Sequence, residues 1–238
     1  MVDTIFPLVL RGACVRRRGT TLVGPIDLEL GACASTAIIG PNGAGKTSLL
    51  RLMHGLERCD GGTVDWSSPA AVARKRQAFV FQTPIIMRRT VLECIAYPLA
   101  IRGMGKKRSR ELAEEWGERV GLKSMLRNPA GALSGGEKQK LALARALTTA
   151  PDVLFLDEPC ANLDGRATKE IEKILSDACS EGTRIVMATH DMGQARRISE
   201  EVLFLYKGRL HESGRTNNFF AAPSTAEAAA FLRGDILL

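Results

Sequence analysis

The segment Gly40-Pro41-Asn42-Gly43-Ala44-Gly45-Lys46-Thr47 decides how the rest of the chain is interpreted, because its spacing is G-x-x-x-x-G-K-[ST]. Apolar residues 36–39 lead into it, and leucines at helical spacing follow from Ser48. A glycine loop between a strand and a helix turns backbone N–H groups toward a phosphate chain, and the helix N-terminus favours the same negative charge. The alternative is a glycine-rich turn before a buried helix. Against it, every position of the pattern matches, and the segments before and after are the strand and helix that the pattern requires. We therefore predict a nucleoside triphosphate site at residues 40–48.

The last two residues of this pattern carry its chemistry. The Lys46 ammonium would reach the β- and γ-phosphates, and the Thr47 hydroxyl would bind Mg²⁺.

A second group of candidate residues follows the apolar segment 153–156, which ends in the acids Asp157 and Glu158. In a chain with a phosphate loop, Asp157 belongs beside Mg²⁺, usually through water. Glu158 is placed to accept a proton from the water that attacks the γ-phosphate. Two acids at the end of a strand are common, so this pair gains its weight from the phosphate loop that precedes it.

Bulk composition indicates a globular protein that does not cross a membrane. The chain has 238 residues, of which 45% are hydrophobic and 25% charged. No apolar run approaches the roughly 20 residues of a membrane helix. The start, Met1-Val2-Asp3-Thr4, lacks the basic and apolar regions of a secretion signal, so we expect a cytoplasmic protein. The scattered cysteines form no C-x-x-C pair and are expected to be free thiols: Cys14, Cys33, Cys59, Cys94, Cys160 and Cys179.

The net charge of +7 is concentrated in three clusters, residues 16–18, 74–76 and 106–108. Nucleic-acid binding, a solvated surface and attraction to an anionic membrane leaflet are three possible reasons for such clusters. The clusters are separate, and no aromatic residues interleave with them as a base-stacking platform requires. We therefore expect a surface near a membrane and no nucleic-acid partner.

Apolar strand patterns alternate with helical patterns over most of the chain. This alternation predicts a mostly parallel α/β sheet. From residue 84 to the segment before Ser134 the pattern is helical instead, which predicts a helical insert beside the sheet.

The segment Leu133-Ser134-Gly135-Gly136-Glu137 precedes an amphipathic helix and supplies a second helix N-terminus with free N–H groups. Two anion sites in one chain suggest that each is half of a composite site. At this segment the sequence resembles the ATP-binding cassette (ABC) ATPase family, and the resemblance extends over nearly the whole chain. Residues 133–137, called the signature segment below, look like that family's signature motif.

The resemblance implies a fold and a domain plan. The fold would be α/β, a phosphate-loop NTPase (RecA-like) with a mostly parallel sheet, an N-terminal antiparallel β part and a helical subdomain insert. Residues 1–238 would form one domain. Its RecA-like core would span about residues 1–83 and 146–220, its helical subdomain about 84–145, and a short C-terminal helix 224–233.

The resemblance also assigns roles to single residues. Gln82 matches a glutamine that contacts Mg²⁺ or the attacking water, so the implied metal set is Thr47, Gln82 and Asp157. Asp164 matches the loop that crosses to an opposite subunit, and His190 matches a histidine that would bind the γ-phosphate and orient Glu158. Considered alone, each of these residues has an ordinary structural explanation. Together and in this order they imply ATP and Mg²⁺ as the ligands.

The implied mechanism needs two copies of the chain packed head to tail. Each ATP would lie between Lys46 and Thr47 of one copy and Ser134 and Gly136 of the other, with Gly135 and Glu137 beside them. Hydrolysis would then open the pair.

One position departs from the family pattern. An aromatic residue usually stacks on adenine near the first strand turn, but this chain has Arg16-Arg17-Arg18 there. Arg18 aligns best, and its planar guanidinium could stack on the base. We expect looser discrimination between ATP and GTP than in the family at large.

The leading functional hypothesis is the cytoplasmic energising subunit of an ABC transporter, peripheral on the inner face of the cell membrane. Its partners would be transmembrane permease subunits, a second ATPase copy and a separate secreted substrate-binding protein. Small-anion importers of the tungstate type are the closest resemblance. The alternatives are an ATPase of a phosphate, amino-acid or lipoprotein-export ABC system, or a soluble ABC ATPase without a transport role. The sequence is compatible with several cargoes, with import or export, and with a homodimer or a heterodimer.

The loop after Gln82 contains the unusually apolar pair Ile85-Ile86, rimmed by Arg88 and Arg89. An exposed apolar patch there would suit a permease partner. Burial of both isoleucines in the helical subdomain is an equally weighted alternative.

Overall fold

The computed structural model describes residues 4–31 and 35–235 and confirms the predicted α/β class. An antiparallel three-stranded sheet forms the N-terminal part, in the order β2-β1-β4. Its strands are β1 (Leu8–Arg17), β2 (Thr20–Leu30) and β4 (Gly61–Trp66). Arg18 and Gly19 make the tight turn between β1 and β2, both with positive φ. The ladder of this sheet begins at Leu8, which pairs with Leu30 and Trp66.

The second sheet has six strands in the order β5-β6-β7-β3-β8-β9, and all neighbours except β8 and β9 run parallel. Its strands are β3 (Ser35–Ile39), β5 (Gln77–Val80), β6 (Val153–Asp157), β7 (Arg184–Ala188), β8 (Glu201–Tyr206) and β9 (Arg209–Arg215). The phosphate-loop strand β3 lies between β7 and β8, so the residues that follow β3, β6 and β7 meet at one edge of the sheet.

Burial on both faces explains the continuous apolar strands. In β6, Val153 and Phe155 enter one hydrophobic cluster while Leu154 and Leu156 enter another, as the two-residue repeat of a strand requires. Such strands are typical of parallel sheets covered on both sides.

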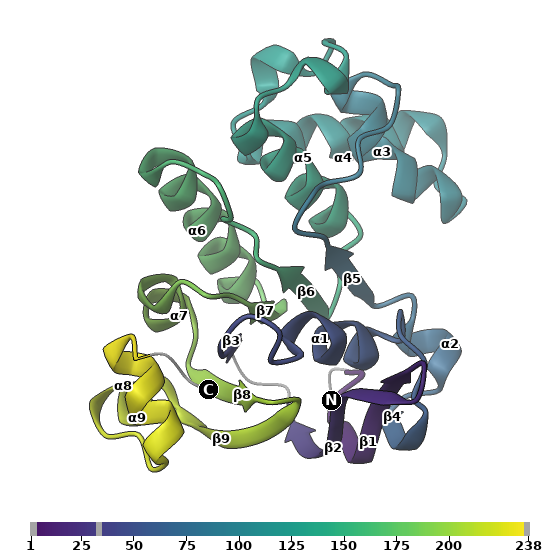
Figure 1. Ribbon diagram of the computed structural model, residues 1–238. Coiled ribbons are helices and arrows are strands. Elements are labelled where there is room, and N and C mark those ends of the chain that lie inside the picture. The colour runs from purple at the N-terminus through teal and green to yellow at the C-terminus, as the bar shows by residue number, and fades with distance from the viewer. Residues whose placement is uncertain (1–3, 32–34, 236–238) are drawn as a thin grey trace.

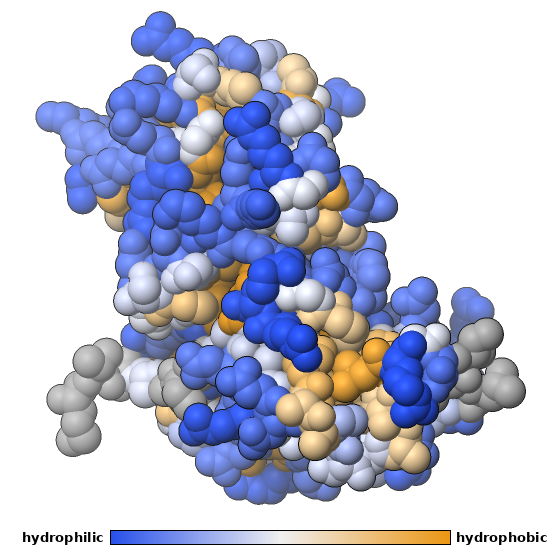
Figure 2. All heavy atoms as spheres, turned by 90° about the vertical axis from the view of Figure 1, so that its left-hand side faces the viewer, coloured by the Kyte–Doolittle hydropathy of each residue, from blue (hydrophilic) through white to orange (hydrophobic). Residues whose placement is uncertain are grey.

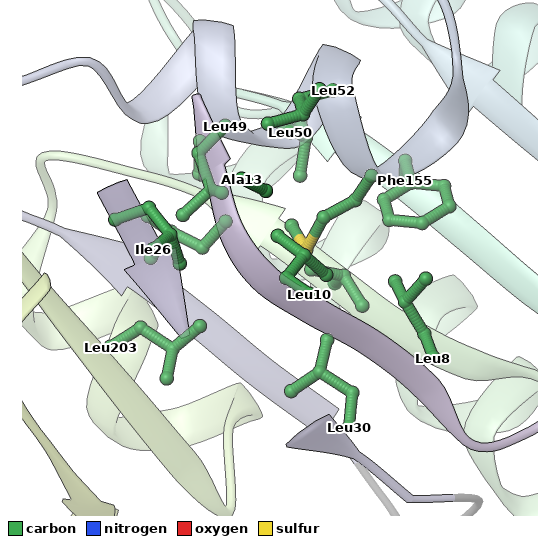
Figure 3. Close-up of a cluster of buried hydrophobic side chains, with 14 of the residues drawn as sticks. Leu8, Leu10, Ala13, Ile26, Leu30, Leu49, Leu50, Leu52, Phe155 and Leu203 are labelled. Carbon is green, nitrogen blue, oxygen red and sulfur yellow. The ribbon is translucent and has the colours of Figure 1, made fainter. Parts of the chain in front are cut away.

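Helix α1 (Lys46–His54) fills the space between the two sheets. Its leucines meet side chains of β1, β2, β6 and β8, as Figure 3 shows for Leu49, Leu50 and Leu52. The other face of the large sheet is covered by α6 (Gly165–Ser180), α7 (Met192–Ile198), α8 (Thr216–Ala221) and α9 (Ala226–Arg233).

The helical part stands to one side of the sheets (Figure 1). It consists of α3 (Val91–Ile101), α4 (Lys106–Arg119), the short 3₁₀ turns η1 (Lys123–Met125) and η2 (Ala130–Ala132), and α5 (Gly135–Leu147). A one-turn helix, α2 (Ala70–Ala73), lies between β4 and β5. Helix α5 packs into both parts. Its Leu141 and Ala144 belong to the hydrophobic cluster formed with α3 and α4, called the helical cluster, and its Leu143 and Leu147 belong to the hydrophobic cluster formed with β6 and β7, called the sheet cluster. The boundary predicted near residue 145 therefore falls inside a shared helix.

Figure 2 shows one face of the molecule as mostly hydrophilic, with hydrophobic residues gathered in areas between hydrophilic ones. Among the described residues, no helix is both long enough and apolar enough to cross a bilayer. Five cysteines in these ranges are free thiols, and Cys33 lies outside the described residues, as does the start at Met1 to Asp3.

Candidate functional site

The phosphate loop connects the end of β3 to the start of α1. Its glycines adopt backbone conformations with positive φ at Gly40, Gly43 and Gly45, where a side chain would be strained. At Gly40 a methyl group would also overlap the carbonyl oxygen of Leu205 in the neighbouring strand. The glycines therefore permit a loop that bends tightly against β8 and leaves its backbone free to surround an anion.

Lys46, the first residue of α1, lies inside the loop. Its Nζ donates to the carbonyl oxygens of Gly40 at 2.8 Å and Pro41 at 3.0 Å, and the residue is only 7% exposed. Burial lowers the pKa of this ammonium, while the carboxylates of Glu158 and Asp157 act to raise it. A positive charge held among carbonyl groups with little water is well placed to bind a phosphate oxygen.

Thr47 and Asp157 face each other across the gap between α1 and β6. The Thr47 hydroxyl donates to Oδ1 of Asp157 at 2.8 Å. Burial raises the pKa of Asp157, which is 4% exposed. The two side chains bring hard oxygen donors together beside the phosphate loop, and such donors fit Mg²⁺.

Glu158 ends the strand segment in an unusual backbone conformation, with φ of 47°. Its N–H donates to the carbonyl of Ala188 on the adjacent strand at 2.9 Å. Its Oε2 accepts from Gln82 Nε2 at 3.4 Å and lies 2.9 Å from Nδ1 of His190. Three residues that are far apart in the sequence thus meet at one carboxylate oxygen.

The segment around His190 is held by hydrogen bonds at the start of α7. The Asp191 side chain caps α7 through the N–H of Gln194, and the Thr189 hydroxyl donates to Oε1 of Gln194 at 2.9 Å. The Asp191 N–H in turn donates to the Thr189 hydroxyl. An Asp that precedes a helix is a recognisable capping signal, so Asp191 could have been identified from the sequence.

A cavity of about 300 Å³ opens above the loop. It is lined by Leu22, Asn42, Gly43, Gly45, Lys46, Thr47, Ser48 and Glu158. Leu22 was missed because an apolar residue in a strand looks like any other core position. The signature segment, Asp164 and Arg18 do not line this cavity; Arg18 lies exposed at the tip of the β1–β2 turn.

The signature segment forms the N-terminus of α5. Ser134 and Glu137 make a capping box, in which the Ser134 N–H donates to Oε2 of Glu137 at 2.8 Å. These hydrogen bonds lower the pKa of Glu137. Ser134 and Gly135 are exposed, and the two glycines pack against the start of α6, where Asp164 is the N-cap. Within this chain the signature segment is therefore built together with the Asp164 turn and apart from the phosphate loop.

A second cavity, of about 450 Å³, lies between the helical part and β5. Ile85, Tyr97 and Ile101 line it, and Ile85 and Ile101 are 63% and 67% exposed. Arg145 donates to the carbonyl of Ile85 at 2.8 Å and fixes this loop. Ile86 instead packs against the helical cluster. Of the two isoleucines, Ile85 is therefore exposed, as a partner surface requires, and Ile86 is packed in the helical part, as the alternative predicted.

The family described as "ABC transporter" matches residues 23–161. The chain is 36% identical over 237 residues to the phosphate import ATP-binding protein PstB 2 of Natronomonas pharaonis, covering 92% of this chain and 84% of that protein. It is 38% identical over 204 residues to the tungstate uptake system ATP-binding protein TupC of Peptoclostridium acidaminophilum, covering 85% and 94%.

Among solved structures, the fold is similar to cbiO1 of Clostridium perfringens, described as part of the ABC transporter complex cbiONQ. The TM-score is 0.82 at 26% identity, and 92% of each chain is covered.

Proposed function

The chain belongs to the ABC transporter family as an ATPase, and we propose that it energises import of a small anion such as tungstate. The observation that carries the proposal is the convergence of Lys46, Thr47, Asp157, Glu158 and His190 around the phosphate loop. Sequence similarity to importer ATPases for tungstate and phosphate supports the transport role.

Each residue of this group has a distinct task in the proposed reaction. Backbone N–H groups of the loop and the Lys46 ammonium bind the β- and γ-phosphates. Glu158 accepts the proton of the attacking water, and His190 holds Glu158 in place from Nδ1 and contacts the γ-phosphate. Thr47, Asp157 and Gln82 hold Mg²⁺, which neutralises charge on the phosphates when bound.

The proposed site is completed by a second copy of the chain. Ser134 and Gly135 are exposed at a helix N-terminus whose contacts within the chain leave them away from their own loop. In a head-to-tail pair they face the nucleotide held by the partner copy, with Asp164 beside them. Arg18, exposed at its turn, is the candidate contact for the base, and comparing ATP with GTP as substrates tests this assignment.

The replacement Glu158→Gln tests the catalytic part of the proposal. It preserves the shape of the side chain and removes the base, so nucleotide binding should remain while turnover falls by about 10²-fold or more. The matched control is Glu118→Gln, an exposed side chain on α4. Turnover near the wild-type rate in Glu158→Gln, measured as phosphate release, would refute the role of Glu158.

The exposed apolar side chains around the second cavity are proposed to bind the permease subunits. Ile85, Tyr97 and Ile101 line this groove, and neighbouring apolar side chains that remain exposed are typical of interaction surfaces. Binding there would hold the ATPase at the inner face of the membrane.

Charge placed in this groove tests the partner surface. In membranes that contain the co-expressed permease, Ile85→Asp and Ile101→Asp should each reduce recovery of the ATPase in the membrane fraction. Val72→Asp is the control, since Val72 is exposed outside the groove. Recovery equal to wild type for both groove variants contradicts the proposal, provided that their basal ATP turnover is unchanged.

Phosphate is the second candidate cargo, because the matched phosphate-import relative aligns with a larger share of this chain. The complex purified from membranes, with its binding protein, distinguishes the two. Tungstate should stimulate ATP turnover in liposomes, and phosphate should not. Stimulation by phosphate alone would favour the second candidate.

A further inference from the structure

The signature segment and the turn at Asp164 touch each other within one chain. A methyl group on Gly136 would lie 3.1 Å from the Cβ of Ala167, and one on Gly135 would lie 4.0 Å from Cδ2 of Leu163. The first turns of α5 and α6 therefore approach closely because the α5 side has no side chains there. Ala167 also donates its N–H to Asp164, which ties this contact to the cap of α6.

One turn further along both helices lies an ion pair. Lys140 follows Gly136 by four residues and Glu170 follows Ala167 by three, so both occupy the facing sides of α5 and α6. Nζ of Lys140 donates to Oε2 of Glu170 at 2.9 Å. The other carboxylate oxygen, Oε1, accepts from Nε of Arg166 at 3.1 Å.

The surroundings of Lys140 distinguish this pair from Lys173–Asp177, another ion pair on α6. Its side chain is 14% exposed, and its Nζ lies 3.8 Å from where a Cβ on Gly121, after α4, would be. The pair Lys173–Asp177 joins residues of the same helix and is 75% and 52% exposed, the kind that contributes little to stability. Lys140 instead joins two helices, and removing Glu170 would leave an ammonium with little water around it.

We propose that Lys140 and Glu170 are positioning residues that hold the signature segment against the start of α6. Ser134 and Asp164 are then presented to the partner's nucleotide as one rigid unit. The inference rests on the composite site proposed above and adds to it the pair that fixes its geometry. The phosphate loop of the same chain does not depend on this pair, because neither residue lines its cavity.

The test separates nucleotide binding from nucleotide-driven pairing. All variants carry Glu158→Gln so that ATP persists. Lys140→Met removes the ammonium, Glu170→Gln removes only the charge, and Lys173→Met is the matched control on α6. Affinity for ADP is measured on the monomer, and the dimer dissociation constant with Mg–ATP is measured by sedimentation. We expect unchanged ADP affinity, and dimerisation weakened about tenfold or more in Lys140→Met and Glu170→Gln but not in Lys173→Met.

The exchange Lys140→Glu with Glu170→Lys should recover part of the lost dimerisation, which a purely local loss of stability would not predict. Should Lys140→Met fold poorly, Glu170→Gln decides, since it preserves the side-chain shape. Unchanged dimerisation in Glu170→Gln overturns the inference alone. Failure of the parent Glu158→Gln to pair with Mg–ATP overturns the composite site, and the inference with it.

Discussion

At the scale of single residues, the most constrained position of the phosphate loop is Gly40. Its φ of 146° and its approach to the carbonyl of Leu205 leave no room for a methyl group. We predict that Gly40→Ala lowers the free energy of unfolding by about 2 kcal/mol or more and abolishes ATP binding. Chemical denaturation and nucleotide titration measure the two effects. Gly131→Ala is the control, since a Cβ there meets nothing within 4 Å; equal losses in both variants would contradict this explanation.

His54 couples the core to pH. It ends α1, its ring meets the edges of Phe79 and Phe155 at 5.4 and 5.6 Å, and its Nδ1 is buried without a hydrogen-bond partner among the described residues. Burial lowers the pKa of this imidazole from 6.5 to about 4. Between these two values the unfolded chain binds a proton that the folded chain does not, so stability falls as the pH falls.

We therefore predict a loss on the order of 3 kcal/mol from His54 between pH 7 and pH 4. His54→Leu should flatten this part of the stability curve, measured by urea denaturation at several pH values. The buried neighbour Met53, replaced by Leu, should leave the slope unchanged. An unaltered slope in His54→Leu would show that another group titrates.

At the scale of elements, the attachment of the helical part depends on α4 as well as α5. Trp116 packs against both the helical cluster and the sheet cluster. The guanidinium of Arg119 lies 4.0 Å from its ring centroid and pairs with Glu181 after α6. Trp116 thus connects the helical part with the sheet part, each of which has its own hydrophobic core.

We predict that Trp116→Ala costs about 2–4 kcal/mol of unfolding free energy, because both clusters lose contacts. Trp116→Phe should restore much of it. Urea denaturation followed by circular dichroism gives both values. A cost below about 0.5 kcal/mol, as for an ordinary surface change, would mean that Trp116 does not join the two parts.

The elements that sequence patterns predicted and those they missed differ in how they are stabilised. Strands β3, β6 and β7 are buried on both faces and were visible as apolar runs. Strand β9 was missed because its residues form no apolar run: they are exposed or alternate between exposed and half-buried. Only the pairing with β8 makes this segment a strand. In the site, Lys46, Asp157 and Glu158 belong to local patterns. The contact of Gly136 with Ala167 and the pair Lys140–Glu170 depend on how two helices cross, which local spacing does not encode.

At the scale of the whole molecule, ATP should couple folding to association. A ligand that binds only folded protein at about 100 times its dissociation constant adds about 2.7 kcal/mol, or about 5–10 °C for a chain of this length. With Glu158→Gln and Mg–ATP, the melting temperature should also rise with protein concentration, since the liganded state is a pair. Scanning fluorimetry at several protein concentrations measures this. With ADP the dependence on concentration should vanish, and its absence with ATP would mean that the chain remains a monomer.

Because β3 lies between β7 and β8, it can pair with its neighbours only late in synthesis on the ribosome. The strand that carries the phosphate loop emerges early, but both of its neighbours are translated last among the parallel strands. A nascent chain halted before residue 184 has no partner for either edge of β3 and must be kept from aggregating until translation ends. Ribosome-bound chains halted there should not retain a fluorescent ATP analogue, whereas chains extended well past β9 should.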